Sequence, residues 1–356
     1  MRYRGAILFI NKKCIMRDLK SEASAAGIRR CWILTDGKAG DELKCLGVAN
    51  ALGLEPEIRH VSPRAPWVWF MPWGPIDPKD KSDKRASPIG GKWPDLVIAS
   101  GRRAVSYVRQ IRRETNDDCF TLYLMDPRTG VNAAHMIWVP EHDWLRGPNV
   151  MVTLTSPHIM SPARLEEERR ADRSLFGDHT PPYIGVLLGG DSQAFTFDEQ
   201  SERELAFLLG EVSSKERDGP TLLITASRRT SPSMLSHIRD ALRGHKYFFW
   251  DGRGENPYLS MLANSEQFIV TADSVNMIGE AVSTGRPVHY YRPTGGHHKI
   301  DHFLNSLEKM GAIRELEIPL EPFSYKPIDA TPEIAGEVIK RFCEWRLLKG
   351  AGIDPS

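Results

Sequence analysis

The sequence predicts an α/β protein of two domains, each built on a parallel β-sheet with helices against its faces. Strand-length apolar runs alternate with helical patterns along the chain, which is typical of parallel sheets with crossover helices. These runs fall into two sets with polar residues between them. A length of 356 residues also exceeds one ordinary domain and leaves room for two separate cores.

The expected strands define the two sheets. The first set consists of residues 31–35, 57–61, 95–99, 120–124, 136–139 and 150–153. The second set consists of residues 183–188, 221–225, 247–250, 267–270 and 288–291. A charged stretch at 164–173 and a turn at 177–182 lie between them, so we place the domain boundary at Pro181 and Pro182.

This boundary gives the expected domain organisation. Residues 1–30 form an N-terminal extension that we expect to be disordered, residues 31–181 the N-terminal domain with a polar loop at 63–94, and residues 182–330 the C-terminal domain. A final helix at 331–347 is predicted to pack back across the domains. Its apolar face consists of Ile334, Val338, Phe342 and Trp345.

Composition excludes several classes of protein. A net charge of +1 argues against general binding of polyanions, so nucleic acid is not expected as a partner. The five cysteines are widely spaced, which fits a reducing cytoplasm better than a disulfide scaffold. No apolar stretch is long enough for a membrane span. We therefore expect a cytoplasmic protein, with peripheral contact to the inner face of a membrane as a further expectation.

The segment 269–291 carries the strongest local signal, because it predicts a strand, a polar turn, a helix and a second strand. The helix is expected to start near Ser274, with Thr271, Asp273 and Ser274 as candidate caps and Asn276 and Met277 in its first turn. A helix start binds anions readily. Glu280 follows six residues after Ser274, where its carboxylate can accept from both hydroxyls of a ribose. The alternative interpretation is an ordinary helix–strand unit with a surface glutamate.

Two more turns follow strands of the second set. Gly189, Gly190, Asp191 and Ser192 form a glycine turn whose backbone amides can approach a ligand, although a plain strand-to-turn pair is the simpler interpretation. The second turn contains Arg228, Arg229 and Thr230, and guanidinium groups suit phosphate oxygens. A solvated basic loop is the alternative. Neither a nicotinamide nor a P-loop fingerprint occurs.

The first set of strands has polar turns of its own. Ligands of parallel sheets bind at the carboxyl ends of the strands, so both sets of turns are expected to face one cleft. His142, between Glu141 and Asp143, is the best-placed candidate general base, although a structural role is the commoner one for a lone histidine. Asp126 with Arg128 is as readily an ion pair as a catalytic pair, and His158 is a third candidate. The remaining candidates in these turns are Asp36, Gly37, Lys38, Gly40, Gly101 and Arg102.

The ordered motifs DGKAG, WPDLVIASGRRA, DPR, VPEHD, LLGGDSQ, TASRRT and TADSVNMIGEAVSTGRPV resemble those of the mitochondrial-fission Elm family. That family is similar to GT-B glycosyltransferases and nucleotide-sugar epimerases. The resemblance implies two Rossmann-like domains facing a cleft, with a nucleotide-sugar bound mainly by the C-terminal one. It implies that Gly189 and Gly190 lie near the donor, that 274–277 face its phosphates, and that Glu280 holds its ribose.

The same resemblance assigns the 36–41 turn to the acceptor. A glycine-glycine-histidine sequence typical of the transferases is replaced here by residues 38–42, Lys-Ala-Gly-Asp-Glu, and Lys44 stands where family members commonly carry glutamine. We expect transfer of a sugar from a nucleoside diphosphate to an acceptor, which a lipid could carry. The alternatives are a non-catalytic adaptor for membrane fission and a nucleotide-sugar epimerase. No resident cofactor is expected.

Two further stretches have competing interpretations. The histidines of 297–302 have metal-ligand types, but we expect them to face the surface or the substrate, with no metal bound. The stretch 65–73 places three tryptophans and a phenylalanine before the lysine-rich 79–85. Aromatic residues beside cations suit a membrane interface, but a loop packed onto the first domain is the interpretation that we favour.

Overall fold

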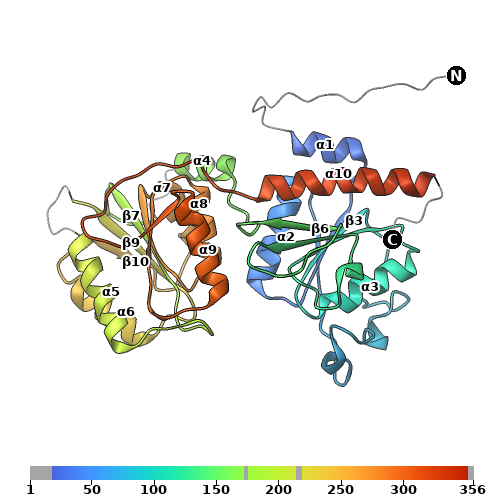
Figure 1. Cartoon of the computed structure of the whole chain (residues 1–356), viewed down its shortest axis with the longest axis horizontal. Helices are drawn as coiled ribbons and strands as arrows, with labels where there is room; N and C mark the ends of the chain where they lie inside the picture. The colour runs from blue at the N-terminus through green and yellow to red at the C-terminus, as the bar shows by residue number, and fades with distance from the viewer. Residues whose placement is uncertain (1–17, 172–174, 214–218, 352–356) are drawn as a thin grey trace.

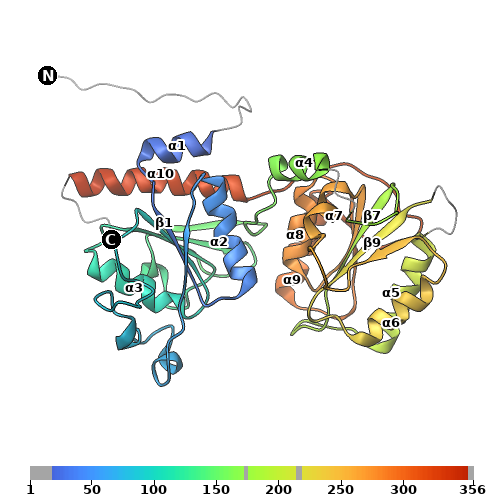
Figure 2. The ribbon, with the colours of Figure 1, turned by 180° about the vertical axis from the view of Figure 1, so that it is seen from behind.

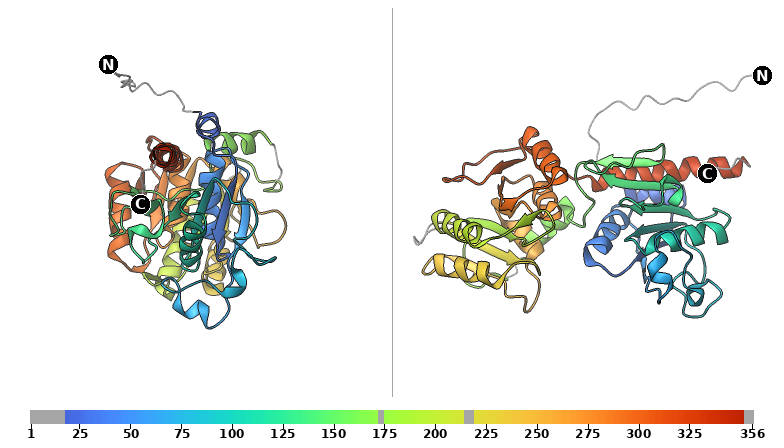
Figure 3. Two further views of the ribbon diagram at one scale, coloured as in Figure 1. Left: turned by 90° about the vertical axis from the view of Figure 1, so that its right-hand side faces the viewer. Right: turned by 60° about the horizontal axis from the view of Figure 1, so that its bottom comes forward.

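The computed structural model describes residues 18–171, 175–213 and 219–351. Two α/β domains lie side by side along the long axis of the molecule (Figure 1), and a second orientation in Figure 3 separates them equally clearly. Within the described residues each domain has a six-stranded sheet whose neighbouring strands are all parallel. The predicted two-domain α/β fold is confirmed.

The N-terminal sheet has the order β2-β1-β3-β4-β5-β6. Its strands are β1 Cys31–Thr35, β2 Glu57–His60, β3 Leu96–Ser100, β4 Phe120–Leu124, β5 Met136–Pro140 and β6 Val150–Thr153. The accompanying helices are α1 Leu19–Ala26, α2 Ala39–Ala51, α3 Ala104–Glu114 and α10 Thr331–Gly350, with short 3-10 turns η1 Trp67–Phe70, η2 Pro78–Asp80 and η3 Val131–Ala133. β1, β3, β4 and β5 are buried along their whole length, which explains their continuous apolar sequences.

The C-terminal sheet has the order β10-β9-β7-β11-β12-β14. Its strands are β7 Tyr183–Leu188, β9 Thr221–Ala226, β10 Tyr247–Phe249, β11 Gln267–Thr271, β12 Val288–Tyr291 and β14 Ile313–Glu315. Its helices are α4 Pro162–Arg170, α5 Glu199–Val212, α6 Pro232–Ala241, α7 Tyr258–Asn264, α8 Val275–Ser283 and α9 His298–Lys309, and β8 Phe195–Thr196 pairs with β13 Thr294–Gly295. In order of appearance the six main strands run 3-2-1-4-5-6, which is the Rossmann order.

The strand order locates a crevice in each domain. The connection after β1 runs to β2 on one side of the sheet, and the connection after β3 runs to β4 on the other side. The turns that follow β1 and β3 therefore diverge and leave a crevice between them. The same reversal occurs between β7 and β11. Ligands of open α/β sheets bind at such switch points. The predicted turns after these four strands therefore occupy the positions where the topology favours binding.

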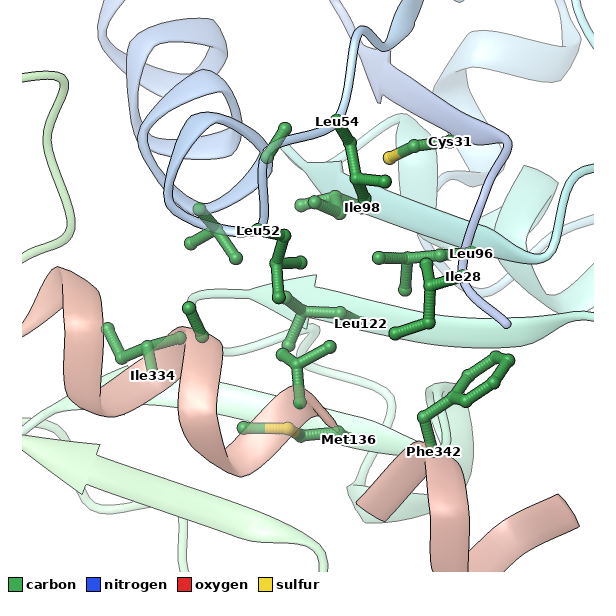
Figure 4. Packing of buried hydrophobic residues seen from close by; sticks show 14 of the residues in the cluster. Ile28, Cys31, Leu52, Leu54, Leu96, Ile98, Leu122, Met136, Ile334 and Phe342 are labelled. Atoms are coloured by element: carbon green, nitrogen blue, oxygen red, sulfur yellow. The ribbon is translucent and has the colours of Figure 1, made fainter. Parts of the chain in front are cut away.

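The apolar core of the N-terminal domain includes the last helix of the chain. α10 packs beside α2 over one face of the sheet, and Figure 4 shows Ile334 and Phe342 of α10 in the same apolar cluster as Leu122 and Met136. All four residues predicted for its apolar face are buried. The chain thus returns from the C-terminal domain to close the core of the N-terminal one, which ties the two domains together at a second crossing.

The structure differs from the predicted organisation at two places. Residues 18–30 contain α1, which packs on α10 and receives a 2.7 Å hydrogen bond from Arg346 to the carbonyl of Ala26, so this part of the expected extension is ordered; residues 1–17 lie outside the described residues. α4 packs on α7, and Met160 and Leu165 join the C-terminal core, although we assigned 154–181 to the N-terminal domain. The boundary between the domains therefore lies before α4, because it is set by apolar packing and not by the proline pair at 181–182.

The insertion between β2 and β3 is braced by buried carboxylates. Asp77 is fully buried and binds the Arg64 guanidinium at 2.8 Å, and this pairing holds the pKa of the Asp77 carboxyl well below its usual range. The buried Asp80 accepts a 2.5 Å hydrogen bond from the hydroxyl of Tyr107 in α3. The polar loop predicted at 63–94 is therefore fastened to the domain beneath it.

We expect Tyr107→Phe to lower the free energy of unfolding by about 1–2 kcal/mol, because it leaves a buried carboxylate without this donor. Urea denaturation measures the change. Tyr183→Phe is the control, because the Tyr183 hydroxyl donates to a backbone carbonyl from a half-buried position. A loss at Tyr107 no larger than that of the control contradicts the bracing role.

Candidate functional site

At the carboxyl end of the C-terminal sheet, a buried carboxylate organises three turns. Asp273 follows β11, and its side chain is completely buried. It accepts hydrogen bonds from the amide of Gly190 at 3.1 Å, from the Thr271 hydroxyl at 2.7 Å and from the Arg229 guanidinium at 2.6 Å. The turns after β7, β9 and β11 are thereby held in one cluster.

The two glycines are required by this packing. A Cβ on Gly189 would lie 2.1 Å from Oδ1 of Asp273, and one on Gly190 would lie 2.1 Å from the Arg229 carbonyl. The amide of Gly189 donates to the Thr271 hydroxyl at 2.7 Å. Both glycine amides thus donate within the protein, whereas we predicted that they would approach a ligand.

Most other polar side chains of these turns are also hydrogen-bonded within the protein. Both arginines are exposed, but Arg229 also donates to the carbonyls of Gly190 and Asp191, whereas the Arg228 side chain makes no hydrogen bond among the described residues. Ser192 accepts from the amides of Ala194 and Phe195. Thr230 donates to the Gly189 carbonyl, and Asp191 accepts from the Phe197 amide at 2.8 Å. Of the two arginines predicted for phosphates, the structure leaves Arg228 the more available.

The start of α8 is open toward the cleft. Ser274 is the N-cap, and among the described residues no side chain accepts a hydrogen bond from the first turn, because Thr271 and Asp273 turn toward the glycines instead. Asn276 is exposed and Met277 half-buried. Unpaired amides and the helix dipole at this position favour an anion. The prediction of a helix start here is confirmed, but Thr271 and Asp273, two of the expected caps, bond the glycine turn after β7 instead.

Glu280 lies farther along α8 and faces the N-terminal domain. With Asn276 and Gly279 it lines a narrow space of about 40 Å³, and Gly40 and Lys44 of α2 line the opposite side. Figure 2 shows α2 and α8 facing each other across the gap between the domains. The Glu280 carboxylate accepts a hydrogen bond from the Tyr258 hydroxyl.

Burial raises the pKa of Glu280 to about 7, although the Tyr258 hydrogen bond and the charge of Lys44 both lower it. Burial also raises the pKa of Tyr258, which therefore remains a hydrogen-bond donor at neutral pH. A carboxyl that titrates near neutrality in a cleft is typical of functional sites. Glu280 is half-buried and bonded to Tyr258, which distinguishes it from an ordinary surface glutamate.

The N-terminal crevice gathers acidic and basic groups. Lys38 is the N-cap of α2, and it too makes no side-chain cap in the described structure. Gly37 and Gly101 both have positive φ, and a Cβ on Gly101 would lie 3.1 Å from Oδ1 of Asp36. That oxygen is buried and has no hydrogen-bond partner among the described residues. Asp36 thus lies at the centre of the crevice, with Lys38 3.5 Å away.

A cavity of about 380 Å³ opens at this crevice. Residues from four turns of the N-terminal domain and from α9 line it: Lys38, Asp41, Gly101, Arg102, Tyr123, Met125, Asp126, Pro127, Arg128, Asp143 and Lys299. Met125 and Arg128 have left-handed backbone conformations, which cluster at binding sites in many proteins. The predicted residues of the first domain that meet here include Lys38, Gly101, Arg102, Asp126 and Arg128.

The candidate bases occupy different surroundings. Asp126 is exposed and accepts a 2.7 Å hydrogen bond from the amide of Arg128, so the pair forms a local turn. Burial lowers the pKa of His142, as do the charges of Lys299 and His302, which favours the neutral imidazole. His142 lies beside Asp143, which lines the cavity.

The domains touch at the rim and at the crossing. Lys299 of α9 binds Asp143 at 2.5 Å across the cleft, and the rings of Trp144 and His298 lie 6.5 Å apart. At the crossing, the His158 amide donates to the Thr331 hydroxyl at 3.1 Å and Nδ1 of His158 accepts from the Met160 amide. His158 thus links the two segments that connect the domains, and its Nε2 lies 3.5 Å from Asp329. It also lines the narrow space beside Glu280, so its predicted position near the cleft is confirmed.

Neither crevice contains a metal site of the usual type. In residues 18–171, 175–213 and 219–351, no group of three or more His, Cys, Asp or Glu side chains is placed to hold a metal ion. Of the 297–302 histidines, His297 caps α9 by accepting from the Lys299 amide. In the same ranges, no helix is long and apolar enough to cross a membrane.

Known proteins resemble this chain over most of its length. The model of the family described as mitochondrial fission ELM1 matches residues 39–342. The chain belongs to this family. It is 26% identical over 390 residues to the mitochondrial fission protein ELM1 of Arabidopsis thaliana, covering 87% of this chain and 90% of that protein. It is 32% identical over 289 residues to an uncharacterized protein of Rickettsia prowazekii, covering 69% and 79%.

A solved structure resembles the whole fold of this ELM1-family chain. The UDP-GlcNAc 2-epimerase of Methanocaldococcus jannaschii superposes with a TM-score of 0.52 and 12% identity, covering 89% of this chain and 99% of that one. At this identity the likeness establishes the fold alone. It confirms the GT-B-like arrangement that the sequence resemblance implied.

Sequence reasoning missed some residues of the cleft. Tyr258 was not singled out, because nothing in the short α7 pattern shows that its hydroxyl reaches Glu280, 22 residues later. Lys44 was noted only as standing where the family commonly carries glutamine, yet its side chain is only 13% exposed and lies opposite Glu280. Lys299 was considered only as part of a histidine-rich stretch. Its place in the first turn of a predicted helix was the one feature that could have indicated a position at the cleft.

Proposed function

We propose that this ELM1-family protein binds a nucleoside-diphosphate sugar in its interdomain cleft and transfers the sugar to an acceptor held by the N-terminal domain. The observation that carries the proposal is the pairing of an open helix start at Ser274 with Glu280, both at the β7/β11 switch point. The GT-B-like fold supports it, because the solved structure with this fold bears the name of an enzyme of UDP-GlcNAc.

The chemistry of the cleft suits this ligand. The amides at the start of α8 would hold the diphosphate, with exposed Arg228 beside it, and the Glu280 carboxylate would accept from the ribose hydroxyls. Lys44 would add a positive charge from the opposite domain. Fixed dipoles and cations of this kind stabilise a leaving diphosphate as a divalent ion does.

The acceptor would occupy the 380 Å³ cavity of the N-terminal domain. Its lining mixes cations such as Arg102 and Arg128 with carboxylates such as Asp41, which suits a polar acceptor. Transfer requires a base to take the acceptor proton. His142 can do so, because its neutral imidazole has a free lone pair, and the buried Asp36 carboxylate is a second candidate.

Calorimetric titration of the intact protein with UDP, ADP, GDP and UDP-sugars tests the binding step. We expect at least one nucleoside diphosphate to bind, and Lys44→Met to weaken it about tenfold, as loss of one charge contact to an anion does. Lys340→Met is the control, because Lys340 is an exposed lysine of α10. Absence of binding by every nucleotide contradicts the proposal.

Two observations favour other functions for the same fold. The family description names mitochondrial fission, which favours a non-catalytic adaptor, and the solved structure bears an epimerase name. Product analysis with a bound UDP-sugar separates the three. Sugar attached to an added acceptor indicates transfer, a changed sugar on the nucleotide indicates epimerisation, and an unchanged ligand indicates an adaptor.

A further inference from the structure

The insertion between β2 and β3 presents three large aromatic side chains to solvent. Trp69, Phe70 and Trp73 are 71%, 56% and 61% exposed, whereas Met71 between them is fully buried. The favoured interpretation of a loop packed onto the domain is confirmed for Met71 and Pro72, whereas these three rings face solvent. Figure 1 shows the insertion projecting from the N-terminal domain on the side opposite α1 and α10. Adjacent exposed aromatic rings of this size mark an interaction surface.

The loop is held rigidly in this position. Arg102 donates to the Met71 carbonyl at 2.7 Å, and Ser106 donates to the carbonyls of Pro72 and Gly74 at 3.0 and 2.8 Å. Arg109 reaches the carbonyls of Pro72 and Trp73 at 3.2 Å. The backbone is thus fastened to α3 and the turn before it, so exposure of the rings is built into the fold.

Charge on the insertion favours a negatively charged partner. Its buried carboxylates, Asp77 and Asp80, are engaged with Arg64 and Tyr107 and contribute little to the surface. Asp83 is exposed but pairs with Lys84 at 3.0 Å. The exposed cations are more numerous: Lys79, Lys81, Lys84 and Arg85.

We propose that this aromatic-basic surface, consisting of Trp69, Phe70, Trp73, Lys79, Lys81, Lys84 and Arg85, docks on an anionic lipid bilayer. Tryptophan and phenylalanine side chains enter the headgroup region, and nearby cations are attracted by anionic lipids. Neither contribution alone gives firm attachment, but the two together do.

The position of the surface links it to the acceptor cavity. The insertion leaves β2 at the carboxyl edge of the sheet, and Arg102 both anchors the loop and lines the cavity. Docking would hold the cavity beside the bilayer, so the acceptor is inferred to carry a lipid anchor. This last step rests on the proposed function, whereas docking itself does not.

Sedimentation of the intact protein with lipid vesicles tests the docking. We expect binding to mixed phosphatidylcholine and phosphatidylglycerol vesicles, and weaker binding to phosphatidylcholine alone. Trp69→Ser/Phe70→Ser/Trp73→Ser should lower the partition coefficient at least tenfold. Lys79→Gln/Lys84→Gln/Arg85→Gln should lower it about fivefold per cation on anionic vesicles only.

Matched controls come from the C-terminal domain. Phe207→Ser removes an aromatic side chain that is 64% exposed on α5, and Arg243→Gln/Arg253→Gln removes two exposed cations; neither should change vesicle binding. Wild-type protein that stays in the supernatant, or an aromatic triple variant that still binds, overturns the proposal. Nucleotide titration without vesicles is independent, so failure of nucleotide binding beside intact vesicle binding refutes only the proposed function.

Discussion

Asp273→Ala is expected to lower the free energy of unfolding by about 2–4 kcal/mol, because it removes a completely buried acceptor and leaves buried donors unpaired. The substitution leaves the Gly190 amide, the Thr271 hydroxyl and the Arg229 guanidinium without their acceptor. Urea denaturation measures the loss. Asp240→Ala is the control, because Asp240 pairs with Arg243 at 2.9 Å on the surface and its removal should cost less than about 1 kcal/mol.

A double-mutant cycle separates this network from general damage. Gly189→Ala alone should cost about 1–3 kcal/mol, because its Cβ would lie 2.1 Å from the Asp273 carboxylate. In the Asp273→Ala background that carboxylate is absent, so the same alanine should cost much less. Strictly additive losses would show that the glycine is required for another reason.

The sequence predicted the fold closely because apolar periodicity is a local property. Buried parallel strands such as β1 and β4 are continuous apolar runs, and their predicted bounds agree with the structure. Short β14 was not predicted, since three residues of which two are exposed carry little pattern. The crossing near His158 was also misplaced, because it depends on contacts between α4 and α7 that lie far apart in the sequence.

The candidate site was predictable in position but not in hydrogen bonding. Strand ends and glycines marked the turns correctly, since a parallel sheet brings the carboxyl ends of its strands to one edge. Which donor meets which acceptor is a tertiary property. Asp273 was considered a helix cap, yet its carboxylate binds the Gly190 amide, 83 residues earlier. The sequence left two interpretations of Glu280, a ribose ligand or a surface glutamate, whereas the burial that raises its pKa depends on tertiary packing.

Titration of Glu280 should make stability fall as pH rises. Its pKa is about 7 in the folded protein against an ordinary 4.5, so between these values the unfolded chain has lost a proton that the folded chain retains. Each pKa unit corresponds to 1.36 kcal/mol, so wild-type protein should lose about 3 kcal/mol between pH 4.5 and pH 8 relative to Glu280→Gln. Parallel curves for wild type and Glu280→Gln contradict the shift.

The same titration should govern ligand affinity. If ribose hydroxyls donate to the Glu280 carboxylate, only the ionised form binds well, so affinity for a nucleoside diphosphate should rise about tenfold from pH 6 to pH 8 for a pKa near 7. Glu280→Gln should bind more weakly at pH 8 and lack this rise. Protonation of the phosphates themselves is common to both proteins and cancels in the comparison. Equal pH dependence in the two proteins would remove Glu280 from the ribose site while leaving the helix start of α8 as the site of the diphosphate.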